Sequence, residues 1–207
     1  YYAKVTSTAT TNLKAATSNC AKITITKGTP SVTLGAKSTT YTGSGITANT
    51  ATTKNPNGGA VTLTVTYTYY TNNSCSSGAT TTAPTNVGNY YVKATTAATS
   101  NLNTGASGCV AHTISQGTPT VSLADRSTTY TGSGITPGTV TSKQPNGGTV
   151  TLTTTPKYYS DSSCATALSS APVNVGTYYA KVTSTATTNL KAATRKNEKI
   201  TISKGTP

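Results

Sequence analysis

The chain repeats its own sequence at a nearly constant spacing. The stretch Thr40-Tyr-Thr-Gly-Ser-Gly45 returns unchanged at residues 129–134, 89 positions later. Ala83-Pro-Thr-Asn-Val-Gly88 returns as Ala-Pro-Val-Asn-Val-Gly at residues 171–176, an offset of 88, so one residue has been lost between Cys164 and Ala171. A period of this length predicts an array in which each repeat is one small folded unit.

The period divides the chain into three segments. We predict that residues 1–30 are the C-terminal part of a preceding repeat, and that residues 31–119 and 120–207 are complete β-sandwich repeats. Residues 178–207 restate residues 1–30, except that Ser18-Asn-Cys-Ala21 becomes Arg195-Lys-Asn-Glu198 and Thr26 becomes Ser203. We interpret the chain as a window on a longer tandem array.

Local patterns within a repeat predict strands and turns. No window has the apolar spacing of a helix. Residues 61–69 alternate apolar or aromatic side chains with threonine, the pattern of a half-buried strand. Pro56-Asn-Gly-Gly59 suits a tight hairpin turn, since Asn-Gly accepts positive φ angles. The other strands are predicted at residues 32–34, 46–53, 86–94 and 111–115.

Six or seven short strands in each repeat predict an all-β fold of tandem immunoglobulin-like β-sandwiches, about 89 residues each. Tyr90 and Tyr178 stand where such sandwiches often place a tyrosine corner, at the start of the penultimate strand. A β-grasp-like repeat is the alternative. It needs a helix, which no segment predicts.

The ordered motifs resemble a known family. Each repeat contains Tyr-Thr-Gly, then Val-Thr-Leu-Thr, then Ala-Pro-x-Asn-Val-Gly-x-Tyr-Tyr. Ile-Thr-Ile follows at residues 23–25 and 200–202, matched by His112-Thr-Ile114. This order is similar to the MBG-type repeats of bacterial surface proteins, which are tandem modules of large secreted adhesins. The resemblance covers essentially the whole chain and implies an extracellular or bacterial cell-surface location. It supplies no ligand site to carry over.

The charge balance is strongly basic. The net charge is +13, and Asp125, Asp161 and Glu198 are the only acids. Basic proteins often meet anionic partners. However, the cations are dispersed except at residues 195–199, and no nucleic-acid-binding motif accompanies them, so we predict no specific nucleic-acid partner. No stretch approaches the ~20 apolar residues of a membrane span, and none is predicted.

The residues that carry out catalysis or bind metals are scarce. General acid–base chemistry needs positioned carboxylates or histidine. The three acids do not recur between repeats, and His112 is the only histidine. A repeated calcium site needs several oxygen ligands, usually carboxylates. We therefore predict no enzyme activity, no catalytic or metal-binding residue and no cofactor.

The four cysteines allow two disulfide patterns in an oxidising location. A Cys75–Cys109 bond closes a loop inside one repeat, worth roughly 3–4 kcal/mol in the loop-entropy model. It leaves Cys20 unpaired and Cys164 facing Asn197, where a cysteine would be expected. The alternative pairs Cys20 with Cys75 and Cys109 with Cys164, at an equal spacing of 55, and joins neighbouring repeats. We favour the first pattern.

The repeats favour a structural role. We predict an array that acts as an adhesin stalk or spacer, or as the building block of an extracellular fibre, with neighbouring repeats of the same or an adjacent chain as partners. The alternative is an adhesive module that binds anionic glycans, mucin or cell-wall polymer. Its expected ligand surface consists of outward-facing tyrosines and lysines: Tyr70, Tyr91, Lys93, Tyr159, Tyr179 and Lys181.

Overall fold

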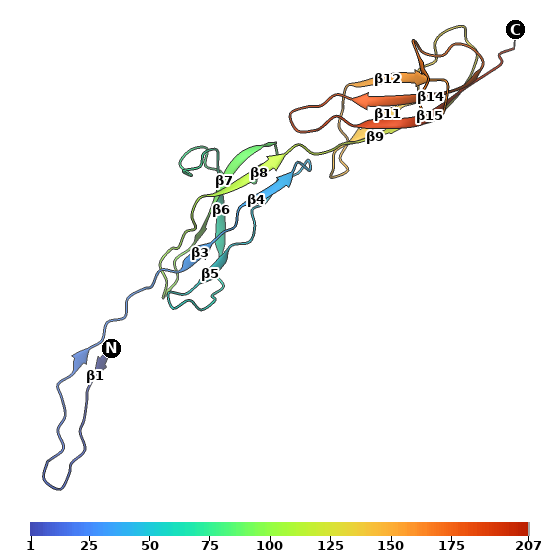
Figure 1. Cartoon of the computed structure of the whole chain (residues 1–207). Helices are drawn as coiled ribbons and strands as arrows, with labels where there is room; N and C mark the ends of the chain where they lie inside the picture. The colour runs from blue at the N-terminus through green and yellow to red at the C-terminus, as the bar shows by residue number, and fades with distance from the viewer. Residues whose placement is uncertain (207) are drawn as a thin grey trace. The chain divides into compact units, whose positions relative to one another are not determined.

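The computed structural model describes residues 1–206, which contain strands, turns and loops but no helix (Figure 1). The prediction of an all-β chain is confirmed. The chain divides into two compact units. Unit 1 consists of Tyr1–Thr33, Ala51–Thr66 and Ala94–Ser107, and unit 2 consists of Leu34–Thr50, Tyr67–Lys93 and Gly108–Pro207. The repeat boundaries at residues 30 and 119 stay predictions from the sequence.

Residues 120–207 supply two sheets of unit 2. The smaller sheet pairs β9 (Thr120–Leu123) with β11 (Val140–Lys143), antiparallel. The larger sheet has the order β10-β15-β14-β12-β13. Its strands are β10 (Arg126–Thr129), β12 (Thr154–Tyr159), β13 (Ala167–Leu168), β14 (Gly176–Ser184) and β15 (Thr194–Ser203). β10 lies parallel to β15, and the other pairs are antiparallel.

The two sheets bury a common apolar core. Val121 and Leu123 of β9 belong to one buried cluster with Val182 of β14 and with Ile200 and Ile202 of β15. These side chains alternate with exposed neighbours because successive residues of a strand point to opposite faces. Burial of each large aliphatic side chain contributes about 1.5–3 kcal/mol. This core joins the two sheets in a two-layer β-sandwich within unit 2.

Residues 31–119 pair their strands in the same way. In unit 1, β3 (Ser31–Thr33) lies antiparallel to β5 (Thr52–Lys54), as β9 does to β11. In unit 2, β4 (Lys37–Thr40) lies parallel to β8 (Val110–Ser115), as β10 does to β15. The sheet order is β4-β8-β7-β6. Its remaining strands, β6 (Val65–Tyr70) and β7 (Gly88–Thr96), continue into unit 1.

The predicted strand pattern differs from the structure in three places. The strand expected over residues 46–53 is only the short β5, because residues 46–51 pair with no neighbouring strand in a ladder. The strand expected over residues 61–69 begins only at Val65, and the preceding stretch lies near β5, where the Val61 amide donates to the Thr53 carbonyl (3.1 Å). The pattern gave no sign of β4, since Lys37-Ser-Thr-Thr40 contains no apolar residue. β4 is a sheet edge that its parallel hydrogen bonds to β8 hold in place.

Residues 1–30 form a hairpin in unit 1, here called the leading hairpin. Its strands β1 (Tyr2–Ala3) and β2 (Ala21–Lys22) are antiparallel, and Tyr2 lies opposite Lys22. Most of its apolar side chains are exposed: Val5 and Ile25 are each 74% exposed. The corresponding residues of β14 and β15, Val182 and Ile202, are 0% and 1% exposed. The same sequence therefore exists once with a core and once without it.

His112 is a core residue of β8. It lies opposite Lys37 of β4, just as Ile200 of β15 lies opposite Arg126 of β10. Its ring is fully buried and meets the Tyr69 ring edge-on, with ring centroids 5.5 Å apart. Burial lowers the pKa of His112, and the positive charge of Lys37 lowers this pKa further. The imidazole is therefore held in its neutral form and serves packing.

Substitution of the twin residues Ile202 and Ile25 by alanine tests this difference in burial. We expect Ile202→Ala to lower the free energy of unfolding by about 2–5 kcal/mol, because it leaves a cavity in the sandwich core. Ile25→Ala should change it by less than about 0.5 kcal/mol, as at other exposed sites. Chemical denaturation measures both values. Equal losses in the two variants would contradict the assignment of the core.

Candidate functional site at the segment junction

The linker between residues 31–119 and 120–207 is held by backbone hydrogen bonds within unit 2. Gly117 forms a parallel bridge with Leu190, which lies in the loop between β14 and β15. The Gly117 amide donates to the Asn189 carbonyl (3.0 Å), and the Lys191 amide donates to the Gly117 carbonyl (2.9 Å). The Gln116 side-chain amide donates to the Thr187 carbonyl (2.7 Å). These bonds fix the linker against the loop.

The same loop inserts an apolar side chain between the two segments. Leu190 is 2% exposed and shares a buried cluster with Tyr41, Ile46 and Ile114, which all belong to residues 31–119. Half-buried side chains pack against this cluster from both segments: Val87 and Tyr90 from the first, Val150 and Leu152 from the second. The two segments thus share one small core within unit 2.

Polar contacts surround the shared core. Asn189 accepts from the Val87 amide at 2.9 Å and donates to the Asn86 side-chain oxygen at 3.0 Å. The Asn146 amide donates to the Thr42 carbonyl at 2.9 Å. The Tyr41 hydroxyl donates to the side-chain oxygen of Gln144. The apolar contact and these directional bonds together define the junction, the candidate functional site of the chain.

Unit 1 contains a second junction of the same kind. Gly28, 89 positions before Gly117, forms a parallel bridge with Leu102. The Gly28 amide donates to the Asn101 carbonyl (3.1 Å), and the Asn103 amide donates to the Gly28 carbonyl (2.8 Å). The Lys27 ammonium donates to the Thr99 carbonyl (2.7 Å). The equivalent contact in unit 2 is the hydrogen bond from Gln116 to Thr187. The contact is therefore a property of the repeated sequence.

The sequence patterns did not predict a role for the loop that holds the linker. The available signal was the recurrence of Asn-Leu at residues 12–13, 101–102 and 189–190, in loops with no strand pattern. The structure gives this leucine its role, because only the fold brings the loop to the linker.

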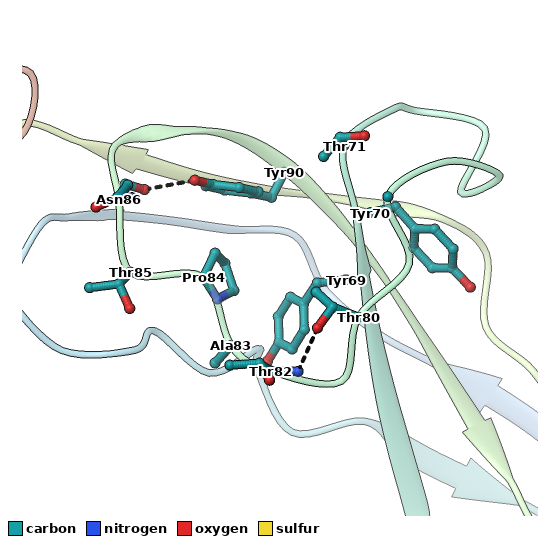
Figure 2. Close-up of a pocket in the computed structure, with 11 residues that line it drawn as sticks. Tyr69, Tyr70, Thr71, Thr80, Thr82, Ala83, Pro84, Thr85, Asn86 and Tyr90 are labelled. Carbon is teal, nitrogen blue, oxygen red and sulfur yellow. Dashed lines mark hydrogen bonds between the residues drawn. The ribbon is translucent and has the colours of Figure 1, made fainter.

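A cavity of about 340 Å³ lies beside the junction residues of unit 2 (Figure 2). It is lined by Tyr70 and Tyr90, and by the Ala83-Pro84-Thr85-Asn86 turn. The Tyr90 hydroxyl donates to the Asn86 carbonyl (3.1 Å), which fixes the aromatic wall. A second cavity, of about 280 Å³, is lined by the equivalent turn around Pro172 and by Tyr178. The same concave feature thus recurs in both segments.

The six residues of the expected ligand surface lie in different environments in the structure. Tyr70 lines the first cavity. Tyr91 and Lys93 on β7, and Tyr179 and Lys181 on β14, are half-buried. Tyr159 is only 7% exposed, so the prediction that it faces outward is wrong. Tyr159 pairs with Tyr179 of β14 on one side and with Ala167 of β13 on the other. The sequence pattern did not predict β13, the short edge strand that flanks Tyr159.

The cysteines follow the intrasegment pattern. Cys75 and Cys109 form a disulfide in unit 2, with their Cα atoms 5.8 Å apart. Cys20 is an exposed free thiol, and Cys164 is a half-buried free thiol. The structure does not contain the alternative pairs Cys20–Cys75 and Cys109–Cys164.

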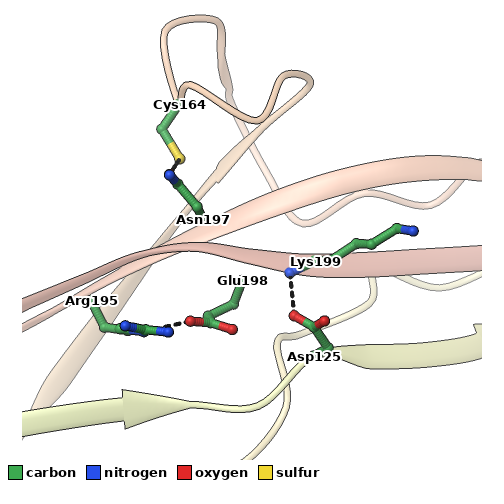
Figure 3. A network of polar contacts seen from close by, with 6 residues as sticks. All are labelled: Asp125, Cys164, Arg195, Asn197, Glu198 and Lys199. Carbon is green, nitrogen blue, oxygen red and sulfur yellow. Dashed lines mark hydrogen bonds and ion pairs between the residues drawn. The ribbon is translucent and has the colours of Figure 1, made fainter.

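The three acids have structural contacts, and Figure 3 shows those of Asp125 and Glu198. Asp125 accepts from the Lys199 amide (2.7 Å), and Glu198 pairs with Arg195. Asp161 closes a turn, where the Ser163 hydroxyl and the Thr166 and Ala165 amides hold the pKa of its carboxyl well below the usual range. Within residues 1–206, no three His, Cys, Asp or Glu side chains are grouped so that they could hold a metal ion, and no helix is long and apolar enough to cross a membrane.

Comparison with known proteins finds only distant similarity. No family model and no curated protein matches the chain. Among solved structures, it is similar to the Drosophila N-cadherin fragment EC1-3, at 10% identity and a TM-score of 0.29, covering 86% of this chain and 68% of that one. Fragment EC1-4 gives 10% identity and a TM-score of 0.30, with 86% of this chain and 51% of that one covered, so the chain spans about half its length. Similarities this low support no inference about function or partners.

Gly117→Ala tests the junction. A Cβ atom at Gly117 would lie 2.3 Å from the Tyr41 carbonyl oxygen, so the linker and Tyr41 must move apart. We expect the free energy of unfolding to fall by about 1–3 kcal/mol, as for other overpacked sites. Gly108→Ala is the matched control, because a Cβ there meets nothing within 4 Å. If chemical denaturation gives the two variants equal free energies of unfolding, the close approach of Gly117 to Tyr41 does not require glycine.

Proposed function

We propose that the chain is a structural repeat array of a bacterial extracellular or cell-surface protein. It acts as an adhesin stalk or spacer, or as the building block of an extracellular fibre. The observation that carries this proposal is the junction, whose Gly–Leu bridge and backbone bonds occur once in each unit. Repeats that contact only their neighbours through one conserved geometry build a quasi-one-dimensional array.

Three further features support an array of immunoglobulin-like modules outside the cell. The equivalent strand pairing 89 positions apart agrees with tandem modules. The Tyr90 hydroxyl bonds back to the Asn86 carbonyl, as a tyrosine corner does. The Cys75–Cys109 disulfide suits an oxidising compartment. The resemblance of the sequence to MBG-type repeats supports a bacterial surface location.

Small-angle X-ray scattering of the 207-residue chain tests the spacer role. A compact chain of this length would have a radius of gyration of about 17 Å, by the scaling for globular domains. We expect a value well above this, unchanged by protein concentration, because stacked repeats extend along one axis. A radius close to that of a compact domain would rule out the spacer.

The recurring cavity favours a second candidate function, an adhesive module for glycans, mucin or cell-wall polymer. Tyr70 and the Pro84 turn form a concave, partly aromatic surface, and the chain carries a net charge of +13. Aromatic walls with a few fixed polar groups are typical of ligand sites.

Binding to a panel of mucins, acidic glycans and cell-wall polymers at ~0.15 M and ~1 M salt tests the adhesive role, since the screening length falls to about 3 Å at the higher salt. If the cavity binds, one ligand should stay bound at high salt, and Tyr70→Ala should weaken it by about tenfold, a loss of ~1.4 kcal/mol. Tyr2→Ala, on the exposed leading hairpin, is the control. Binding that vanishes with salt, or is equal in both variants, removes the site.

A further inference from the structure

The leading hairpin already has the conformation of the β14–β15 hairpin. Tyr2 lies opposite Lys22 just as Tyr179 lies opposite Lys199. The Ser7 amide bonds to the Ala16 carbonyl, and the Ser184 amide makes the same bond to Ala193, at 2.9 and 2.8 Å. The sequences differ only at residues 18–21 and 26. One hairpin is thus preformed to fit the place of the other.

The two hairpins differ in what covers their apolar face. Val5, Ile23 and Ile25 of the leading hairpin are 74%, 46% and 74% exposed. Their twins Val182, Ile200 and Ile202 are at most 1% exposed, in the core between the two sheets of residues 120–207. The sandwich of residues 120–207 is therefore a surface that demonstrably fits the apolar face of the leading hairpin.

The cysteines make the fit specific. In residues 31–119, Cys75 is bonded to Cys109. At the corresponding place, Cys164 instead has Asn197 as its neighbour, with its Sγ 3.2 Å from the asparagine Oδ1 (Figure 3). Cys75 and Cys164 share an unusual positive φ, 51° and 55°. The leading hairpin carries a free, exposed cysteine, Cys20, at the position of Asn197, so it holds the partner that Cys164 lacks.

The neighbouring residues favour the same replacement. Glu198 is buried in β15, 9% exposed, and its carboxylate is paired with Arg195. The leading hairpin has Ala21 and Ser18 in these places, which correspond to Val110 and Ser107, 89 positions later in the repeated sequence. Removal of a buried carboxylate avoids its desolvation cost. Asp125, which accepts from the Lys199 amide, would find the same backbone donor at Lys22.

We propose that the leading hairpin of one copy of this chain replaces the β14–β15 hairpin in the sandwich of a second copy, and that Cys20 of the first copy then forms a disulfide with Cys164 of the second. Exchange of equivalent elements is a low-cost route to association. Burial is conserved, since one hairpin enters the core as its near-identical twin leaves, and the disulfide holds the exchanged state. A molecule of these 207 residues has one such hairpin and one acceptor sandwich, so the links between such molecules would continue head to tail.

The bond needs an oxidant, which we take to be a low-molecular-weight disulfide. The two cysteine thiols lose two protons and two electrons, one S–S bond forms between Cys20 and Cys164, and the small disulfide is reduced to two thiols. The inference rests on the proposed extracellular role, because only an oxidising compartment keeps such a link.

Non-reducing electrophoresis of the purified chain with oxidised glutathione tests the link. We expect a ladder of covalent oligomers that dithiothreitol collapses, with a Cys20–Cys164 bond in the peptide map. Cys20→Ser and Cys164→Ser should each abolish the ladder, and their mixture should give dimers only. Asn197→Cys should also abolish it, because Cys164 then has a partner within its own sandwich. Dimers joined by Cys20–Cys20 bonds, with no Cys20–Cys164 bond in the peptide map, would overturn the proposal.

A second pair of variants separates hairpin exchange from chance collision of thiols. Ile25→Asp leaves the free chain folded, because Ile25 is exposed, but it would bury a charge after exchange. It should reduce the linked product by at least about tenfold, since an unpaired buried charge is costly. Ala9→Asp is the matched control, because its twin Ala186 is exposed within the sandwich segment. Equal linking in both variants would refute the exchange.

The proposed function and this link fail separately. An extended chain by X-ray scattering that forms no Cys20–Cys164 bond keeps the spacer role and refutes the link. A compact chain that forms the Cys20–Cys164 bond supports the link and refutes the spacer role.

Discussion

The contact of Leu190 with the Gly117 linker is the constraint on which the arrangement of the repeated segments depends within unit 2. Two backbone hydrogen bonds hold the linker to the loop, and the buried leucine joins side chains from both segments in one cluster. Glycine is required at the linker, because the Tyr41 carbonyl oxygen leaves no room for a Cβ atom. Unit 1 makes the equivalent contact between Gly28 and Leu102, so the geometry follows from the repeated sequence and not from one local accident.

This contact suits a chain with few charged and few large apolar residues. Only 9% of residues are charged and phenylalanine, tryptophan and methionine are absent, so the cores are small and depend on isoleucine, valine, leucine and tyrosine. Small cores leave little surface for broad apolar interfaces. A junction made of one leucine, one glycine and a ring of amide bonds needs little apolar area, yet it is directional because hydrogen bonds fix its geometry.

The leading hairpin and the β14–β15 hairpin separate local from tertiary effects. Their shared sequence sets the same strand register and the same loop bonds in two different environments. Burial differs, because the sheet of β9 and β11 covers the apolar face of the β14–β15 hairpin. Val5 and Ile25 of the leading hairpin are not covered in this way by any of residues 1–206. Register is thus a local property of this sequence, whereas stability comes from the second sheet.

From its sequence alone, the chain could be recognised as all-β and repetitive, since strand alternation and an 89-residue period are visible in the letters. The alternating pattern also located β7 and β8 closely. Three features needed the tertiary structure: the edge strand β4, which has no apolar residue, the burial of Tyr159, and the Gly117–Leu190 junction. Each depends on contacts between residues far apart in the chain. A periodic pattern indicates which side chains lie on the same face of a strand, but not which distant segment covers that face.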